Sequence, residues 1–366
     1  MVEIEIPLVP EKSKEFLNEK QVVDYRNYRR EFIEWLKVFG KEPEEVEGYA
    51  EDTVKRTAYR VGKWERFIWK QEGGYSVPLD HSHADAYLKH LATSDHSSAH
   101  QTNTQASLKR YFKWRAHEHA EDEWEPEFTF SKKNSTNPPD FLTKSERKKL
   151  REAALNYGTI PTYDSLTPEE RTRWKRHVAQ VIRKPVEDVK PDDWKRVNGW
   201  KYTSMVWVSL DAGLRPVEVG RATVDWVDLD NELLRIPKQD SSKNRNNWQV
   251  GLTSRTADAL QHWLDERKNY ERYHDTDALW LTREGNPYGS NSLRRILHRL
   301  CEKAGIDIEN RSMSWYSIRH SVGTGMAKER GLAAAQAQLR HESVQTTMKY
   351  DQVPVDERRD ALDRMG

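Results

Sequence analysis

The chain has 366 residues, of which 33% are charged and 36% are hydrophobic, and this length suggests two globular domains. No run of about 18 apolar residues occurs, and the acidic start of the chain lacks the order of a secretion signal, so we expect a cytoplasmic protein rather than a membrane-spanning or exported one. The single cysteine, Cys301, excludes an internal disulfide and any metal cluster built on cysteines.

The net charge of +1 is low for a protein that binds nucleic acid, but the charge is unevenly distributed. Residues 1–140 contain 21 Lys or Arg and 26 Asp or Glu, whereas the remaining residues contain 39 and 33. The second part of the chain is therefore the more basic one. Because a local basic face matters more than a total, this asymmetry is compatible with a nucleic-acid partner.

Residues 14–118 carry apolar and aromatic side chains at helical spacing, interrupted by glycine, proline and short polar clusters. The pattern predicts helices at 22–39, 53–71, 83–92 and 102–117. The next stretch is acidic and then rich in proline and asparagine, with few apolar residues, which favours an interdomain linker. We therefore predict a helical domain at 1–120, a linker at 121–140 and a second domain at 141–366.

The second domain is expected to begin with a helix at Thr143, because Glu146 three residues later completes a capping box. Residues 159–200 resemble an insertion of charged helices around two prolines. After Arg215, Pro216 occupies the position of a first helical residue and marks a further helix start.

Three short runs then have strand character and predict a small antiparallel sheet, at 223–227, 233–237 and 248–252. Ser290 and Gly305 bound another predicted helix, and the last sixty residues read as helical. The expected fold is mainly α with a small antiparallel β-sheet.

Four segments of the second domain contain the residue types that phosphoryl transfer requires, and they read DAGLRPVE at 211–218, DSSKNR at 240–245, SWYSIRHS at 314–321 and LRHESVQTTMKY at 339–350. A planar guanidinium can grip two phosphate oxygens at once, and a tyrosine supplies an oxygen nucleophile. Cations neutralise the charge that builds on the phosphate. The candidate site residues are Arg215, Lys243, Tyr316, Arg319, His341 and Tyr350.

In order and spacing, these segments resemble the motif boxes of the tyrosine recombinase (phage-type integrase) family, over roughly residues 141–360. The tyrosine in the third box is closest to archaeal site-specific integrases. The resemblance implies that Tyr350 attacks a DNA phosphate, forms a 3′-phosphotyrosine and releases a 5′-hydroxyl. The side chains that would stabilise the additional negative charge are Arg215, Tyr316, Arg319 and His341.

The second box supplies a lysine that, in the family, protonates the departing 5′-oxygen. An alkoxide is a poor leaving group, so a positioned acid accelerates such a step by about 10²–10⁴. Lys243 is the predicted acid, and Lys238 at the end of the preceding strand is the alternative if the hairpin is shorter.

The chain departs from the family pattern at two positions. Tyr316 stands where most members have a histidine, and a phenol with a pKa near 10 is a poor base at neutral pH. We therefore predict that Tyr316 binds phosphate, and we leave the acceptor of the nucleophile's proton unassigned. His320 is expected to be structural. Arg340 replaces a glycine before His341, a change expected to affect the local backbone more than the chemistry.

The resemblance implies a helical N-terminal core-binding (SAM-like) domain followed by a catalytic domain of the DNA breaking-rejoining fold. Basic side chains interleaved with aromatic ones on two N-terminal helices fit DNA contact. The predicted DNA-binding residues are Lys55, Arg56, Arg60, Lys63, Lys109, Arg110, Lys113 and Arg115.

The expected function is site-specific recombination that integrates or excises a mobile element. The resemblance implies a homo-tetramer on paired double-stranded DNA sites, with residues 353–365 docking into a neighbour or into their own domain. No cofactor is expected, because the covalent link conserves the bond energy, and no metal, because the cations already supply positive charge. The alternatives are a type IB topoisomerase-like relaxase and a DNA-binding protein with an inactive remnant of the site.

Overall fold

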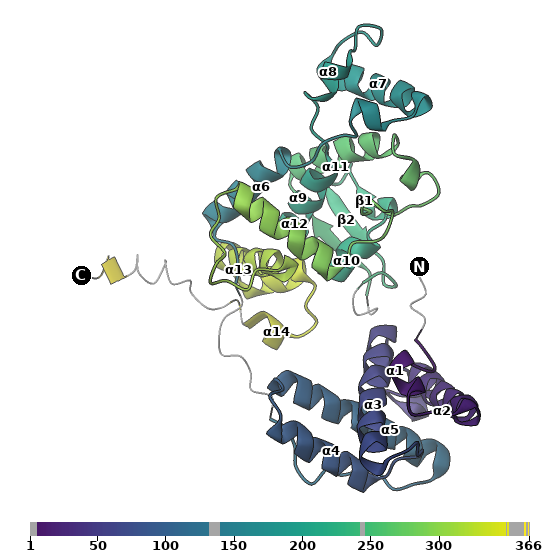
Figure 1. Cartoon of the computed structure of the whole chain (residues 1–366). Helices are drawn as coiled ribbons and strands as arrows, with labels where there is room; N and C mark the ends of the chain where they lie inside the picture. Colours follow the sequence, from purple (N-terminus) through teal and green to yellow (C-terminus); the bar gives the residue numbers. More distant parts are fainter. Residues whose placement is uncertain are drawn as a thin grey trace. The chain divides into compact units, whose positions relative to one another are not determined.

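The computed structural model describes residues 6–131, 140–241, 246–348, 350, 362, 363 and 365. The chain forms two compact units, Met1–Thr136 and Asn137–Gly366 (Figure 1), so the boundary falls inside the stretch predicted as a linker. The beginning of that stretch nevertheless packs on unit 1, where Trp124 is buried against the helical core with Phe128 and Phe130 beside it.

The regular elements described in unit 1 are all helices. Its elements are α1 (Glu11–Lys14), α2 (Glu19–Val38), the 3₁₀ helix η1 (Pro43–Glu45), α3 (Glu51–Glu72), α4 (His81–Thr93) and α5 (Ser98–His119). The four long helices match the four predicted ones but begin two to four residues earlier. Polar caps precede the apolar pattern and cause the difference, for example the reciprocal hydrogen bonds of Asn18 with Gln21 and of Asp80 with His83.

Aromatic rings fill the centre of unit 1. Tyr111 lies among Phe32, Trp64 and Phe112, at centroid distances of 5.7, 5.1 and 5.0 Å. Such large rings bury much apolar area at low entropic cost, so a polar chain still builds a core here.

Unit 2 begins with α6 (Lys144–Leu155), and the predicted capping box of Thr143 with Glu146 is confirmed. The central helix is α9 (Lys201–Ala212), which packs against α6, α11, α13 and β3. The remaining helices are α10 (Pro216–Arg221), η3 (Val224–Trp226), α11 (Ser254–Arg267), η4 (Glu271–Tyr273), α12 (Ser290–Lys303), α13 (Trp315–Leu339) and α14 (Val344–Met348). α13 consists of two helical segments, because Gly331 has φ 82° and interrupts it.

The sheet has three antiparallel strands in the order β1 (Val227–Asp228), β2 (Leu233–Ile236) and β3 (Trp248–Gly251). Leu234 pairs with Val250 in the register, and these buried side chains face the core while Arg235 faces out. The first predicted strand was largely wrong. Val224 donates its N–H to the carbonyl of Asp277 rather than to the sheet, and η3 forms there instead.

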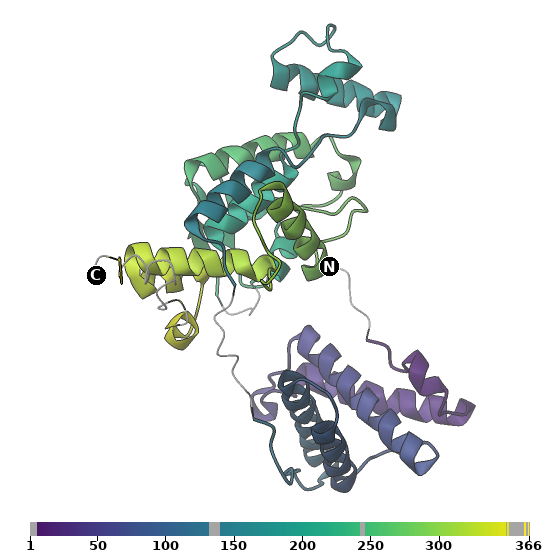
Figure 2. The same ribbon diagram turned by 60° about the vertical axis from the view of Figure 1, so that its left-hand side comes forward.

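Residues 159–198 form a small lobe that projects from the rest of unit 2 in both views (Figures 1 and 2). The lobe contains η2 (Tyr163–Ser165), α7 (Pro168–Ile182) and α8 (Pro191–Trp194) around a core of its own that includes Trp174 and Trp194. The predicted insertion of charged helices is therefore a separately packed subdomain.

The prediction of a mainly α fold with a small antiparallel sheet is confirmed. Among the helices that the structure describes, none combines the length and the apolar character needed to cross a lipid bilayer.

Candidate active site

The start of α10 places the first arginine. α9 ends at Gly213, which has φ 59°, a conformation that glycine adopts without strain. A β-carbon at this position would also lie 2.6 Å from Leu339 Cδ2, so the close approach of the two segments requires a glycine. Arg215 follows as the N-cap of α10, and Pro216 begins the helix as predicted.

Glu218 lies beneath Arg215 and is fully buried. Its Oε1 accepts a hydrogen bond from Arg215 Nη1 at 2.8 Å, and its Oε2 accepts from the backbone N–H of Arg215 at 2.8 Å. Oε2 also pairs with Nη2 of Arg340 at 2.7 Å. Although burial raises the pKa of Glu218, the charges of Arg340 and Arg215 outweigh it and lower the pKa to about 2. The carboxylate therefore stays ionised and links the two guanidiniums.

Arg319 joins two segments that are far apart in the sequence. It is 2% exposed, and its guanidinium donates to the carbonyl of Gly213 at 2.6 Å and to the carbonyl of Leu339. Burial and the neighbouring charges of Arg215 and Arg340 lower its pKa to about 9, so it remains a cation at neutral pH. The backbone bonds hold this charge in place without neutralising it.

Arg340 is a further arginine of this cluster. The expected effect on the local backbone is present, since its φ is 58°, in the left-handed region. The side chain, however, is 3% exposed, pairs with Glu218 and donates to the carbonyl of Ala212 at 2.8 Å. Its charge is therefore part of the same buried cluster as Arg215 and Arg319.

Tyr350 is packed into this cluster from the C-terminal side. The residue is 4% exposed, and its ring lies parallel to the His341 ring, with centroids 5.9 Å apart and an interplanar angle of 7°. Its hydroxyl lies 2.9 Å from His320 Nδ1. Burial raises the pKa of Tyr350 to about 12, against the lowering effect of the Arg319 and Arg215 charges. The phenol is thus within electrostatic reach of two predicted phosphate ligands.

His341 lies in the loop between α13 and α14 and is 7% exposed. Its Nδ1 lies 2.9 Å from Thr347 Oγ1, which fixes the orientation of the ring. Tyr316, in the first turn of α13, is 45% exposed, and its ring centroid is 6.4 Å from that of His320. An exposed phenol at this position is accessible to a phosphate.

The structure describes only one of the two candidate lysines. Lys243 lies outside the described residues. Lys238 is exposed just after β2, and its backbone N–H donates to Asn247 Oδ1 at 2.7 Å. The structure thus positions the alternative, and both lysines remain predictions.

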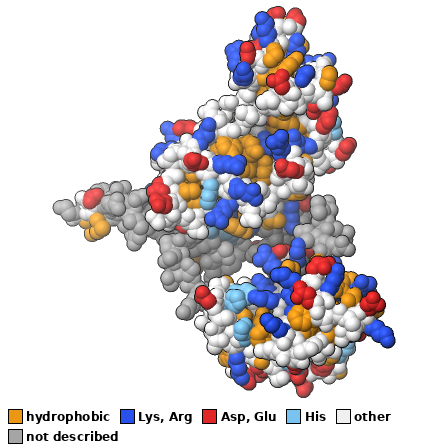
Figure 3. Space-filling view, viewed as in Figure 1, with side chains coloured by type: hydrophobic (Ala, Val, Ile, Leu, Met, Phe, Trp, Pro, Cys, Tyr) orange, Lys and Arg blue, Asp and Glu red, His pale blue; other side chains and the backbone are white. Residues whose placement is uncertain are grey.

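The predicted DNA-binding residues of unit 1 divide into two groups. Arg56, Arg60 and Arg110 lie close enough for their charges to interact, across the packed helices α3 and α5. Basic side chains gather on the visible face of this unit (Figure 3). Lys55, Lys63 and Lys109 are partly or fully exposed on the same two helices.

Several members of the predicted set also have contacts within unit 1: Arg56 forms an ion pair with Asp52 at 2.8 Å, and Arg110 donates to Thr57 Oγ1 at 3.2 Å. Arg115 is 7% exposed and forms an ion pair with Glu121, so this side chain anchors the segment after α5 and is not available to DNA. Lys113 donates to the backbone carbonyl of Lys41 at 2.8 Å. The prediction was wrong for Arg115, because a 3.6-residue repeat of basic residues does not reveal which of them meets a carboxylate from a later segment.

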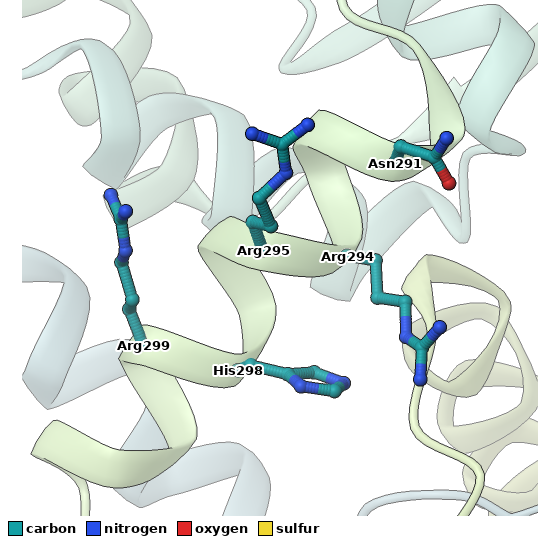
Figure 4. Close-up of a pocket in the computed structure, with 5 residues that line it drawn as sticks. All are labelled: Asn291, Arg294, Arg295, His298 and Arg299. Atoms are coloured by element: carbon teal, nitrogen blue, oxygen red, sulfur yellow. The ribbon is translucent and has the colours of Figure 1, made fainter.

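A basic face on α12 was missed by the sequence reasoning. Asn291, Arg294, Arg295, His298 and Arg299 line a surface hollow of about 460 Å³ (Figure 4). Arg295 and Arg299 extend together from one side of the helix, and Arg294 and His298 from the other. The signal was present as two pairs at i and i+4, opposite the buried Leu293, Ile296, Leu297 and Leu300.

His320 was likewise missed as a neighbour of Tyr350. Its spacing of four residues from Tyr316 places both on one helical face, and this spacing was the available signal. The described cluster therefore combines the buried guanidiniums of Arg319 and Arg340, the half-buried guanidinium of Arg215, one bridging carboxylate, and a tyrosine whose hydroxyl lies beside one imidazole and whose ring stacks on another. Such a set can bind a phosphodiester through its cations and present an oxygen nucleophile to it.

Comparison with known proteins shows which proteins this part of the chain resembles. The model of the phage integrase family matches residues 193–356. This range contains the arginines, histidines and tyrosine of the cluster, which are Arg215, Arg319, His320, Arg340, His341 and Tyr350. Tyrosine recombinase XerC of Chlamydia pneumoniae is 26% identical over 166 residues, covering 44% of this chain and 50% of the relative. Tyrosine recombinase XerA of Saccharolobus solfataricus is 23% identical over 228 residues, covering 58% and 68%.

The second part of the chain is therefore similar to tyrosine recombinases. It spans about half the length of the first curated relatives that it matches. Members of the tyrosine recombinase family are enzymes, and the resemblance drawn from the four sequence boxes is confirmed.

Solved structures of tyrosine recombinases share the fold. The XerH recombinase bound to its palindromic difH substrate has a TM-score of 0.56 at 16% identity, covering 94% of this chain and 88% of that one. The Tn1549 transposon integrase in complex with transposon right end DNA has a TM-score of 0.53 at 16% identity, covering 90% and 98%. At this identity the likeness concerns the fold, and it agrees with a helical domain followed by a catalytic domain of the breaking-rejoining type.

Proposed function

We propose that the chain is a site-specific DNA recombinase that cleaves and rejoins strands through a 3′-phosphotyrosine at Tyr350, and that it integrates or excises a mobile element. The observation that carries the proposal is the position of the Tyr350 hydroxyl. It is buried beside His320 and feels the charges of Arg319 and Arg215, which are held by contacts that leave them cationic. A structural core tyrosine needs no such surroundings.

Cleavage follows from these positions as an in-line displacement. Tyr350 Oη forms a bond to phosphorus and loses its proton, and the bond from phosphorus to the 5′-oxygen breaks. The guanidiniums of Arg215 and Arg319 stabilise the charge on the non-bridging oxygens, with His341 and Tyr316 as hydrogen-bond donors. Lys243, or Lys238 in its place, protonates the leaving 5′-oxygen.

Rejoining reverses the step with a different strand. An incoming 5′-hydroxyl attacks the phosphotyrosine, the phosphodiester forms again, and the tyrosine recovers its proton. The covalent link retains the energy of the original bond, so the exchange needs no nucleotide cofactor.

Double-stranded DNA is the proposed substrate, and two basic surfaces support this. The α12 residues Arg294, Arg295 and Arg299 and the unit 1 cluster of Arg56, Arg60 and Arg110 offer several phosphate contacts. The chain is proposed to act as a homo-tetramer on two paired sites. Analytical ultracentrifugation with DNA duplexes should then give a four-protomer complex, and a persistent one-to-one complex would contradict it.

The decisive experiment measures a covalent adduct. The protein is incubated with nicked duplexes drawn from the DNA that flanks its gene, and protein–DNA links that survive denaturation are quantified. The wild type and the control Tyr163→Phe, in the inserted lobe, should form the adduct. Tyr350→Phe should form none while binding the same DNA. An adduct that persists in Tyr350→Phe would place the nucleophile elsewhere.

The same material separates recombination from relaxation. A recombinase exchanges strands only between two copies of its site, whereas a topoisomerase-like relaxase removes supercoils from any plasmid. Strand exchange that depends on the sequence of the site would support the proposal, and relaxation without such dependence would favour the relaxase.

A further inference from the structure

The hydroxyl of Tyr350 has a neighbour that is chemically suited to remove its proton. His320 Nδ1 lies 2.9 Å from Tyr350 Oη, and the two ring centroids are 5.8 Å apart. His320 follows Arg319 directly on α13, so one helical turn carries both a guanidinium of the site and this imidazole. We propose that His320 accepts the proton of Tyr350 during cleavage, in place of the histidine that the chain lacks at position 316. The inference rests on the proposed role of Tyr350 as the nucleophile.

The chemistry creates the need for such a base. Burial raises the pKa of Tyr350 to about 12, although Arg319 and Arg215 oppose the change. At pH 7 a phenol with that pKa is ionised in about one molecule in 10⁵. A base that takes the proton while the bond to phosphorus forms removes this requirement for a free phenolate.

The other groups around the hydroxyl are less suited to the task. Arg215 and Arg319 are donors only and have no lone pair to offer. His341 directs Nδ1 to Thr347 Oγ1 and stacks its face on the tyrosine ring. Tyr316 is a largely exposed phenol. Among the described residues around the hydroxyl, His320 combines a basic atom with hydrogen-bonding distance.

The geometry of α13 explains how the proton acceptor can stand at position 320 rather than at position 316. Residues 316 and 320 are separated by four positions and therefore lie on one face of α13, one turn apart. Their ring centroids are 6.4 Å apart. An imidazole at position 320, one turn after position 316, lies next to Tyr350. Position 316 can then hold a phenol that binds phosphate.

The proton balance is complete with the groups named. His320 begins as the tautomer with hydrogen on Nε2 and a lone pair on Nδ1. The proton of Tyr350 moves to Nδ1 as Oη bonds to phosphorus, and the lysine proton moves to the 5′-oxygen as it leaves. In rejoining, the incoming 5′-hydroxyl gives its proton to the neutral lysine as its oxygen bonds to phosphorus, and the imidazolium returns its proton to the tyrosine oxygen as the bond from that oxygen to phosphorus breaks. His320 thus serves as the base in one direction and the acid in the other.

Tyr350 lies near the charges of Arg319 on α13 and Arg215 at the start of α10. Arg340 and the carboxylate of Glu218 in turn act on Arg319, whose pKa of about 9 leaves it a cation at neutral pH. The rate of cleavage should therefore rise with pH as the imidazole loses its proton and level off when it is neutral.

The test uses single-turnover formation of the covalent adduct by the full chain. His320→Gln should lower the rate by about 10²–10⁴, keep DNA binding and lose the rising part of the pH profile. His274→Gln, an exposed histidine on unit 2, is the control and should match the wild type. The double variant Tyr316→His with His320→Gln should recover about tenfold or more, because it returns an imidazole to the same helical face.

The outcomes separate this inference from the proposed function. No Tyr350-dependent adduct in the wild type would remove the proposed function and this inference with it. A normal adduct with an unchanged rate and pH profile in His320→Gln would overturn only the inference. If His320→Gln also weakens DNA binding, the double variant decides: recovery of the rate supports the base, and no recovery overturns it.

Discussion

Replacement of Arg340 by glycine tests whether this residue contributes a charge or only a backbone conformation. The two views predict changes in stability of opposite sign. The residue has φ 58°, so glycine removes steric strain, yet the same change removes a buried cation that pairs with Glu218 at 2.7 Å. Glycine also occupies this position in the family pattern, so the substitution is compatible with the fold.

The magnitudes favour the charge. A non-glycine residue in the left-handed region costs about 1–2 kcal/mol, and glycine costs about 0.5–1 kcal/mol in chain entropy, so the backbone effect stabilises by about 0–1.5 kcal/mol. Removal of one partner of a buried ion pair destabilises by about 3–5 kcal/mol. Because Glu218 keeps Arg215 as a second partner, the lower end of about 3 kcal/mol applies. Arg340→Gly should therefore destabilise unit 2 by about 1.5–3 kcal/mol, by the same estimates.

Guanidinium chloride unfolding of the full chain, followed by tryptophan fluorescence, measures the effect. Arg183→Gly is a matched control, since Arg183 has φ 54° at the end of α7 but is exposed. The control should be neutral or slightly more stable. If Arg340→Gly behaves like Arg183→Gly, the buried charge contributes nothing and the reasoning is refuted.

Three further sets of substitutions test other parts of the structure. A β-carbon at Gly323 would lie 2.7 Å from the ring of the proposed nucleophile, so Gly323→Ala should slow adduct formation by about 10²-fold with DNA binding retained; a normal rate would show that the ring is placed differently during cleavage. Of Lys243→Ala and Lys238→Ala, the one that removes the acid should slow cleavage by about 10²–10⁴, and equal, small effects from both would exclude a lysine acid in this hairpin. Arg295→Gln with Arg299→Gln should reduce the slope of log affinity against log salt by about 0.9 for each DNA phosphate that the protein no longer neutralises. An unchanged slope would show that these two arginines of α12 do not contact DNA phosphates.

The local features of the fold were predictable because their causes are local. The capping box at Thr143, the helix start at Pro216 and the four N-terminal helices depend on neighbouring residues, and each was found close to its expected position. The strand predicted at 223–227 was not, because its backbone partners lie some fifty residues later at Asp277 and Ala278. Short apolar runs do not contain that information.

In the candidate site, too, features defined by local spacing were predictable, whereas contacts between distant residues were not. The order and spacing of the four boxes are the basis on which Arg215, Arg319 and Tyr350 were predicted, and the structure brings these three residues close together. The ion pair of Arg340 with Glu218 joins residues 122 positions apart, and the contact of His320 with the tyrosine spans 30. Contacts of this kind depend on the completed fold, so the sequence alone did not predict the contact of Arg340 with Glu218 or of His320 with Tyr350.

The two ends of the inserted lobe meet in a way that bears on how unit 2 could be altered. Gly199 donates its N–H to the carbonyl of Gly158 at 2.9 Å, and Thr159 pairs with Asn198 beside it. The chain thus leaves and re-enters the rest of unit 2 at adjacent positions, and residues 159–198 bury Trp174 and Trp194 in a core of their own. A tight turn could join Gly158 directly to Gly199 with little displacement of α6 or α9. The lobe is therefore a natural site for inserting a foreign domain or for shortening the protein.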